Sequence, residues 1–534
     1  MTSEPRAFLT LDAGAATTAA ALIGRVGSRW RLVGSLSMPA GADVEAIVSV
    51  LGDRAVAADP ALAAALDLRP GGAVHLPRLE VSSHPPPRLA VVAASDRALA
   101  ALVATAARSG WRTVAGSPES MDPLAMSTLL LDAGVDGILV GASDPPAADE
   151  RRALGELAAL VSAAAGRRPE LTVVLAGGMA EHLAAFGDSG ARAGEVLLGP
   201  AAHRNAPGGP LAELLIELAA PPDDARRSLG AGALALAEVL DRRVDVVEIG
   251  FDGGTRAAAA PGVGGGPPMR DLALVPTAAL APTDPDDSVI DRVGRWSTWG
   301  ADRHRLRDRL RELRVSPWAD ATGEGATLRM AAARAALGRL AEYTPEWNGR
   351  PPADLVVATG GAWAVAAAPA VALALVDVLR RPGAGQFALD HARILAPLGS
   401  IPDADERRAM VADLLDDLLA PLGTVVTPAG MRSGRSAGSM VLHGDGQAMR
   451  RDLMPGGLAL IDLPPGSSAV AEFRFRDTIR LGTRGRHFAI DVTGGLGGLV
   501  VDLRDVPLRL PDRADLRGEL LEAWQTAIVS GVDA

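Results

Sequence analysis

Short apolar runs recur along the chain, and each is followed by a turn of small residues and then by an alanine-rich stretch. Clear examples are RLAVVAASDRALAALVATAA (88–107), DGILVGASDPPAADERRALGELAALV (136–161), LTVVLAGGMAEHLAAF (171–186) and DLVVATGGAWAVAAAPAVALALV (354–376). Continuous apolar runs are typical of strands buried on both faces, and the alanine-rich stretches predict the helices that cover them. The sequence therefore predicts an α/β fold with mostly parallel sheets.

The pattern changes in two places. Glycine and proline are frequent in residues 257–288, which predicts a long loop there, before helices at 302–313 and 328–343. Near the C-terminus, VAEFRFRD (470–477) places Phe473 and Phe475 on one face, which predicts a half-buried strand. Two further strand-like runs in 487–510 and a helix near LRGELLEAWQTAI complete a predicted β-rich C-terminal domain.

Composition narrows the possible chemistry. The 534 residues are enough for two to four domains, and 48% of them are hydrophobic. A net charge of −11 argues against a nucleic-acid partner, which would select a basic surface. The chain has neither cysteine nor lysine, which excludes thiolate catalysis, disulfides, a lysine Schiff base and a Walker A loop. The longest uncharged stretch, 362–376, is shorter than the ~20 residues of a membrane span, so we expect a cytoplasmic protein without a membrane partner.

The first candidate site follows the apolar run AFLTL. Asp12 ends that run, and Gly14, Thr17 and Thr18 follow it. In a hairpin of this kind the carboxylate can orient magnesium-bound water, while the glycine and the hydroxyls let phosphate oxygens approach hydrogen-bond donors. The alternative is an ordinary D-x-G turn between two strands, and the residues alone leave both open.

The stretch VDVVEIGFDGGTRAAA (244–259) repeats that layout. Glu248 lies near the end of an apolar run, and Gly250, Asp252 and Gly253 follow it. Two hairpins of one design, in two separate α/β units, favour a shared phosphate site more than either does alone. The alternative is a loop that is glycine-rich only in order to turn.

A third candidate is VVATGGAWA (356–364), in which a strand ends at Thr359, Gly360 and Gly361. The glycines allow close backbone approach, and the helix start after them suits a ribose or a phosphate. Tight packing of the strand against the helix is the alternative explanation.

Paired phosphate hairpins followed by a strand, two glycines and a helix resemble the sugar-kinase, heat-shock-70 and actin superfamily. More narrowly, the chain resembles the glutamate mutase L (MutL/GlmL) family in LTLDAGAATTAAALI, DVVEIGFDGGT, FALDHARILAPLGSI and 354–430 as a whole. The resemblance implies two actin-like (ribonuclease-H-like) ATPase domains with a β-rich C-terminal extension. The implied bounds are 1–240 for lobe I with α/β insertions, 241–423 for lobe II and 424–534 for the extension.

The resemblance also implies a function: an ATP-binding accessory protein that reactivates an adenosylcobalamin-dependent mutase, with ATP and Mg²⁺ as cofactors and possible weak ATPase activity. Asp12 and Glu248 would be catalytic, and Asp12 would also position the metal. The remaining predicted ligands are Gly14, Thr17, Thr18, Gly250, Asp252, Gly253, Thr359, Gly360 and Gly361.

The chain departs from the family pattern within the hairpins. Ala15 and Ala16 stand where the family carries hydroxyls, and Phe251 follows Gly250. Each lost hydroxyl removes roughly 0.5–1.5 kcal/mol of phosphate binding. The alternative function is therefore a degenerate actin-like scaffold that binds a protein partner without ATP turnover. A small-molecule kinase ranks last, because no catalytic base near a substrate pocket is evident.

Overall fold

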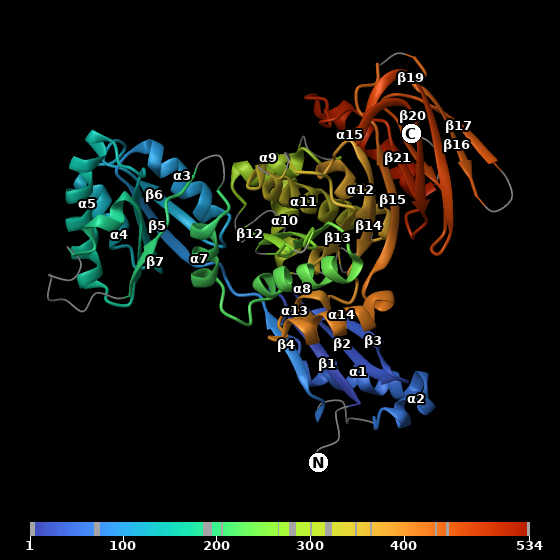
Figure 1. The fold of residues 1–534 in the computed structure, drawn as a ribbon, viewed down its shortest axis with the longest axis horizontal. Coiled ribbons are helices and arrows are strands. Elements are labelled where there is room, and N and C mark those ends of the chain that lie inside the picture. Colours follow the sequence, from blue (N-terminus) through green and yellow to red (C-terminus); the bar gives the residue numbers. More distant parts are fainter. Residues whose placement is uncertain are drawn as a thin grey trace.

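The computed structural model describes residues 6–68, 75–184, 195–203, 207–251, 253–264, 266–276, 285–298, 302–315, 323–345, 347, 350–363, 366–432, 435–444 and 448–530. These residues form a mixed α/β protein with four sheets (Figure 1), which confirms the predicted α/β class. Across the same ranges, no helix combines the length and the apolar character that a bilayer crossing needs.

The first sheet is built around the N-terminal hairpin. Its strands are β1 (Ala7–Ala13), β2 (Thr17–Val26), β3 (Arg29–Pro39) and β4 (Arg78–Ser82). β1 and β3 each pair antiparallel with β2, and β4 lies parallel to β1. Leu9 and Leu22 pack on α1 (Val44–Ala58) and α2 (Pro60–Ala65), whereas Phe8 and Ile23 face the opposite side. Both faces of the hairpin are therefore buried.

The second sheet has the order β12-β11-β10-β13-β14-β15-β21-β18. Its strands are β10 (Val244–Ile249), β11 (Gly254–Ala260), β12 (Met269–Val275), β13 (Leu355–Thr359), β14 (Gly383–Leu389), β15 (Ala420–Thr427), β18 (Leu458–Ile461) and β21 (Leu499–Asp502). β10, β11 and β12 form an antiparallel meander, and β13 lies parallel to β10. The first four strands thus repeat the order and directions of β1 to β4.

The predicted loop at 257–288 is wrong in part. β11 continues to Ala260, and β12 occupies Met269–Val275 within the tract. Leu272, Ala273 and Leu274 pair with β11 and are buried or partly buried. The flanking glycines and prolines turn the chain between strands. Because these residues are typical of loops, the sequence pattern did not predict the short strand between them. Residues 265 and 277–284 of the tract lie outside the described residues.

Three helices lie between the two hairpin sheets: α8 (Ala225–Leu240), α13 (Leu395–Gly399) and α14 (Ala404–Leu418) (Figure 1). Their buried side chains share one core with Phe8 and Ile23 of the first sheet and Val246 of the second. The other face of the second sheet packs on α11 (Gly323–Glu342) and α12 (Ala368–Val378), near α9 (Asp287–Gly294) and α10 (Arg303–Val315).

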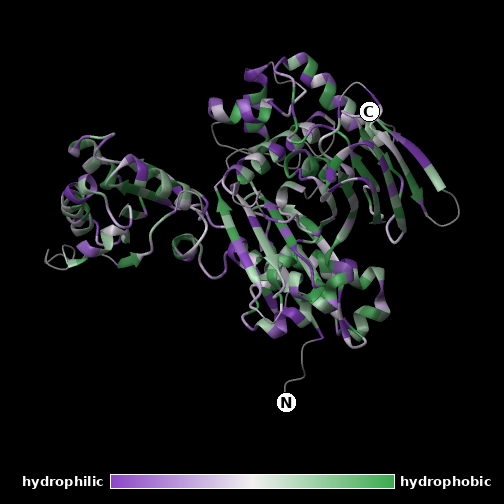
Figure 2. Ribbon diagram, turned by 45° about the horizontal axis from the view of Figure 1, so that its top comes forward, coloured by the Kyte–Doolittle hydropathy of each residue, from purple (hydrophilic) through white to green (hydrophobic). Residues whose placement is uncertain are grey.

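A separate α/β unit is inserted between β4 and α8. Its five strands are all parallel, in the order β6-β5-β7-β8-β9. They are β5 (Arg88–Ala93), β6 (Arg112–Gly116), β7 (Gly137–Ala142), β8 (Thr172–Gly177) and β9 (Val196–Gly199), and they pack with α3 (Asp96–Ala107), α4 (Pro123–Leu130), α5 (Ala148–Arg167) and α7 (Pro210–Ala219). Figure 2 shows its central strands as hydrophobic. The strands predicted near 88, 136 and 171 are confirmed.

The C-terminal segment forms a four-stranded antiparallel sheet, β17-β16-β19-β20, from β16 (Gly438–His443), β17 (Ala448–Leu453), β19 (Ser468–Leu481) and β20 (Thr483–Thr493). The predicted strand at 470–477 is confirmed as part of β19, and the predicted terminal helix as part of α15 (Ala514–Ser530). β18 and β21 of this segment join the second sheet instead. The predicted domain boundary at 423/424 falls inside β15. The predicted domain boundary at 240/241 coincides with the end of α8.

A buried network of charges ties α11 and α12 to the residues around β21. The Asp377 carboxylate lies 2.6 Å from Arg334 Nε and 2.8 Å from Arg504 Nη1. Arg504 also binds both oxygens of Asp502, at 2.8 and 2.9 Å, and stacks 4.2 Å above the ring of Trp524. Burial opposes its charge, yet Asp377 and Asp502 together raise the pKa of Arg504.

We predict that Asp377→Ala destabilises the protein by about 3–5 kcal/mol, because Arg334 and Arg504 would stay buried without their shared carboxylate. Urea unfolding followed by tryptophan fluorescence measures the loss. Glu156→Ala, on an exposed position of α5, is the control and should cost less than about 0.5 kcal/mol. Equal stability of the two variants would contradict a structural role for the network.

Candidate functional site

The turns of the two hairpins and the glycine pair after β13 line one cavity of about 290 Å³. The predicted site residues on its walls are Asp12, Gly14, Thr17, Glu248, Gly250, Gly253, Thr359, Gly360 and Gly361. Thr18 does not line the cavity: it follows Thr17 on β2, where neighbouring side chains point to opposite faces, and it is buried. Asp252 lies outside the described residues.

The first hairpin places Asp12 near the end of β1. The turn closes when the Gly14 N–H donates to the Thr17 carbonyl at 2.9 Å. A Cβ on Gly14 would lie 2.8 Å from that same oxygen, so a larger residue does not fit this turn. Ala15 and Ala16 form the tip and line the cavity, and among the described residues their N–H groups donate no hydrogen bond. The tip therefore offers two backbone donors to a ligand.

The second hairpin is closed in the same way, because the Gly250 N–H donates to the Gly253 carbonyl at 2.9 Å. Glu248 Oε2 accepts a hydrogen bond from the Thr255 hydroxyl at 2.9 Å, and Oε1 lies close to Gly250. Phe251 lines the cavity but is only 4% exposed, because it packs into the core with Ile249 and Leu340. It narrows the cavity from one side and leaves the turn intact.

The glycine pair brings β13 close to both hairpins. Gly360 has φ +106°, and a Cβ there would lie 2.6 Å from the Ile249 carbonyl oxygen. A Cβ on Gly361 would lie 2.6 Å from the Thr17 hydroxyl oxygen of the other sheet. Glycine is required at both positions. Gly360 needs it for its left-handed backbone, and Gly361 needs it for its close contact with Thr17 across the cleft.

The sequence reasoning missed Arg393, which lines the cavity. Its Nη1 donates to the Thr17 hydroxyl at 2.7 Å, and its Nε lies 3.4 Å from Asp12 Oδ2. Its side chain is 5% exposed and its φ is +54°, an uncommon value for a residue other than glycine. The signal was the motif FALDHAR, in which Asp390 ends a strand and turns the chain toward this arginine.

Asp390 holds that turn in place. Its carboxylate accepts hydrogen bonds from the N–H groups of Ile394 and Leu395 and from the Thr359 hydroxyl, each at 3.1 Å. Burial raises the pKa of Asp390 to about 6, and the three donors oppose that shift. The same carboxylate thus links the strand end at Thr359 to the loop that carries Arg393.

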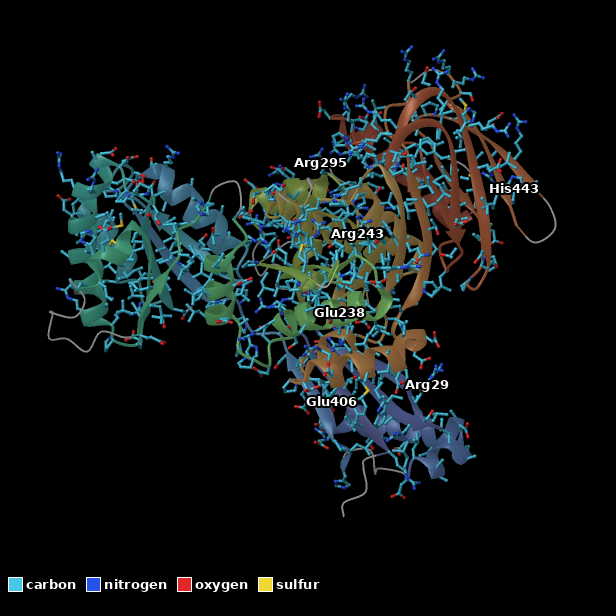
Figure 3. All side chains as sticks on the ribbon, viewed as in Figure 1. Arg29, Glu238, Arg243, Arg295, Glu406 and His443 are labelled. Atoms are coloured by element: carbon cyan, nitrogen blue, oxygen red, sulfur yellow. The ribbon has the colours of Figure 1, made fainter. Side chains whose placement is uncertain are left out.

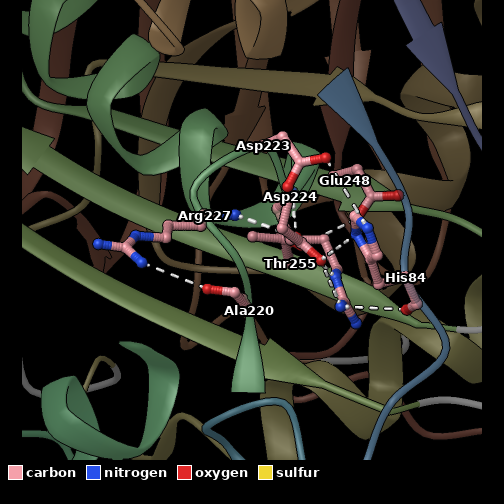
Figure 4. Close-up of polar contacts among 8 residues, drawn as sticks. His84, Ala220, Asp223, Asp224, Arg227, Glu248 and Thr255 are labelled. Atoms are coloured by element: carbon pink, nitrogen blue, oxygen red, sulfur yellow. Dashed lines mark hydrogen bonds and ion pairs between the residues drawn. The ribbon is translucent and has the colours of Figure 1, made fainter. Parts of the chain in front are cut away.

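A second group of charges lies beside the cavity, and His84 and Arg226 of this group line it. Asp224 caps α8 and binds Arg226 at 2.7 and 3.1 Å, and its Oδ2 lies 3.6 Å from His84 Nδ1. Arg226 Nη2 also donates to the His84 carbonyl at 3.2 Å. Figure 4 shows Asp224 and His84 close to Glu248 and Thr255. The sequence reasoning did not identify this group, because its members come from the ends of the inserted unit.

The cavity disfavours negative charge on its own carboxylates. Burial raises the pKa of Glu248 to about 7; the Thr255 hydroxyl opposes that shift and the charge of Asp12 adds to it. Burial also raises the pKa of Asp12, against the effect of Arg393. Perturbed carboxyl groups in a cavity are a feature of functional sites, because a general base needs a pKa near the working pH.

The carboxylates fit a magnesium ion that arrives with phosphates. Proteins commonly bind Mg²⁺ through one or two carboxylates, while water and substrate phosphates supply the other ligands. Asp12 and Glu248 provide two such groups at one cavity, and a cation would offset their burial. In the described part of the chain, no group of three or more histidines and carboxylates could hold a metal.

No protein-family model and no curated protein matches the chain. Among solved structures, a Ppx/GppA enzyme from Aquifex aeolicus is 8% identical and covers 76% of this chain and 88% of its own, with a TM-score of 0.18. A second structure of the Aquifex aeolicus Ppx/GppA family is 9% identical and covers 77% of this chain and 90% of its own, also at 0.18. Likeness at this level carries no argument about function, so the interpretation depends on the cavity itself.

We predict that Glu248→Gln stabilises the protein at pH 8 and has little effect at pH 5. The folded protein holds a proton on Glu248 up to about pH 7, whereas an unfolded glutamate releases it near its model value of 4.5. The wild type therefore loses stability as the pH rises from about 4.5 through 7, and glutamine does not.

At pH 8 we expect Glu248→Gln to raise the free energy of unfolding by on the order of 1–3 kcal/mol, measured by urea unfolding. Glu156→Gln, an exposed position on α5, should show no such dependence on pH. A Glu248→Gln effect of the same size at pH 5 and pH 8 would contradict the burial of an ionisable carboxyl group.

Proposed function

We propose that the chain is an actin-like nucleotide-binding protein that holds ATP and Mg²⁺ in the cavity between its two hairpin sheets. One observation carries the proposal: two hairpins of repeated strand order, each with a carboxylate near its turn, line one cavity together with Gly360 and Gly361. The repeated order, a three-stranded meander with a parallel fourth strand, supports reading the sheets as the cores of two actin-like lobes.

The groups on the walls suit a triphosphate. The N–H groups of Ala15 and Ala16 and the guanidinium of Arg393 are donors for phosphate oxygens. Gly360 and Gly361 have no side chains, so the sugar or the base can approach the backbone. With a pKa of about 7, Glu248 can accept a proton from an attacking water. Magnesium, when bound, would neutralise part of the phosphate charge, and Asp12 would hold it.

Arg393 supplies positive charge at the first hairpin. The chain contains no lysine, and the guanidinium reaches the first hairpin from the loop after β14. Arginine binds phosphate through a planar fork and stays charged when buried. A nucleotide would therefore have to share Arg393 with Asp12 and Thr17, which favours slow turnover.

A specific observation favours the second candidate, a scaffold that binds a protein partner without nucleotide. Arg393 already bonds to Thr17 and faces Asp12, and Gly361 lies against the Thr17 hydroxyl. The chain's own groups thus bridge the cleft at the place where phosphates would lie. The two candidates differ in whether ATP can displace these contacts.

We predict that ATP with Mg²⁺ stabilises the wild type by about 2.7 kcal/mol at 100 times its Kd, seen as a higher thermal midpoint. Thr17→Val should weaken ATP binding roughly 3–10-fold, because one hydroxyl is lost at the cavity, and Arg393→Ala by roughly 10–100-fold. Titration calorimetry measures both.

Thr18→Val is the matched control, since it is a buried threonine on the same strand whose side chain does not line the cavity. It should bind ATP like the wild type. No thermal shift at millimolar ATP in the wild type would overturn nucleotide binding and favour the scaffold.

We further propose that the partner is an adenosylcobalamin-dependent mutase, which this chain reactivates. The resemblance of 354–430 and of the two hairpin stretches to the glutamate mutase L family supports this role. The inserted unit and the C-terminal sheet lie outside the two hairpin sheets and offer surfaces for a partner (Figure 1). Nucleotide can drive release of damaged cofactor only if its affinity differs between two arrangements of the lobes.

The expected result is that this chain with ATP restores turnover to such a mutase after inactivation by hydroxocobalamin, and that Arg393→Ala does not. Release of the corrinoid, followed by absorbance, is the measurement. A chain that binds ATP but leaves the mutase inactive would contradict the mutase role and leave nucleotide binding standing.

A further inference from the structure

A second cavity, of about 670 Å³, lies between the second sheet's helices and the C-terminal segment. It is remote from the hairpins: its walls come from α9, α11, the loop after α12, and residues that follow β21. Its charged lining consists of Arg292, Arg295, Arg350, Arg380, Arg381 and Arg480, with only Glu342 and Asp377 opposing them. In a chain of net charge −11 this is a local excess of positive charge.

Both carboxylates of this cavity are already bound. Glu342 receives two hydrogen bonds from Arg292 Nη1, at 2.9 and 3.0 Å. Asp377 forms ion pairs with the buried side chains of Arg334 and Arg504. Neither group is therefore available to balance the remaining arginines of the lining.

Three of those arginines form no ion pair among the described residues: Arg295, Arg381 and Arg480. Arg381 donates only to the carbonyl groups of Trp347 and Arg350. Arg295 and Arg480 have exposed side chains at the cavity mouth, and Figure 3 shows where Arg295 lies. The three arginines thus line the cavity from the C-terminal end of α9, the loop after α12 and β19.

Arg380 adds a buried donor. Its side chain is 3% exposed and lies 2.8 Å from Asp502, but its Nε has no hydrogen-bond partner in the part of the chain that is described. Burial lowers the pKa of both Arg380 and Arg381, and neighbouring arginines add to the shift. Guanidinium groups keep their charge in proteins, so their burial here costs desolvation free energy. A bound anion would offset that cost.

Size and lining indicate a small molecule. The volume lies in the range of ligand pockets, which is roughly 300–1,000 Å³. Trp296, Pro345, Val506 and Leu508 provide apolar walls beside the charged end. Planar guanidinium groups bind phosphate through paired hydrogen bonds. We propose that this cavity binds a phosphorylated small molecule, with its phosphate on Arg295, Arg381 and Arg480 and its organic part on the apolar wall.

The test is titration calorimetry of the full chain with inorganic pyrophosphate, which represents the charged end of such a ligand. The wild type should bind one equivalent at this site, more weakly as salt is raised. Arg295→Ala with Arg480→Ala should weaken binding at least about tenfold, since two charge-assisted contacts are lost. Both side chains are exposed, so the fold should persist, which far-UV circular dichroism checks.

Arg29→Ala is the matched control, because Arg29 is an exposed arginine on the first sheet (Figure 3). It should bind pyrophosphate like the wild type. Citrate should bind more weakly than pyrophosphate if the site selects phosphate. The proposal is overturned if no saturable binding occurs at millimolar pyrophosphate, or if the double variant binds as tightly as the wild type.

Discussion

The contact of Arg393 with Asp12 and Thr17 is the interaction on which the cleft depends. Two carboxylates, Asp12 and Glu248, line one cavity; burial raises the pKa of both, and the charge of Asp12 adds to the shift of Glu248. A cation must lie between the hairpins for that arrangement to be stable near neutral pH. The chain provides it from the loop after β14, and Asp390 fixes that loop by capping the following turn.

Close helix packing sets where the two hairpins meet. α8 and α13 pack through Gly232, which lies against the Leu395 carbonyl, and through Gly399, which lies against the Ser228 carbonyl. Any side chain at either position would collide with backbone. Because α8, α13 and α14 share one core with both sheets, a change in the angle between the sheets must repack that layer. We therefore expect any motion of the lobes to be small in amplitude and discrete rather than continuous.

The sequence predicted the parts of the fold that depend on local pattern. Apolar runs located the buried strands β5, β7, β8 and β13, and the alternation at Phe473 and Phe475 located β19. The same reasoning could not predict that β18 and β21 leave the C-terminal sheet for the second sheet, because that pairing is between segments distant in sequence. It also missed β12, a short strand between glycine- and proline-rich turns.

The candidate site was predictable to a similar extent. Gly14, Gly250 and Gly360 were identified because their turns have a recognisable composition, and the structure places all three at one cavity. Thr18 was not distinguished from Thr17, since only the direction of a strand's side chains separates them. Arg393 and Arg226 were missed because each reaches the cavity from a distant segment, and a single charged residue carries no local pattern. The most direct measurement is hydrogen–deuterium exchange with and without Mg²⁺-ATP. We predict joint protection of peptides that contain residues 12–18, 248–255 and 359–361. Protection confined to other segments, or absent at saturating nucleotide, would contradict a shared nucleotide site.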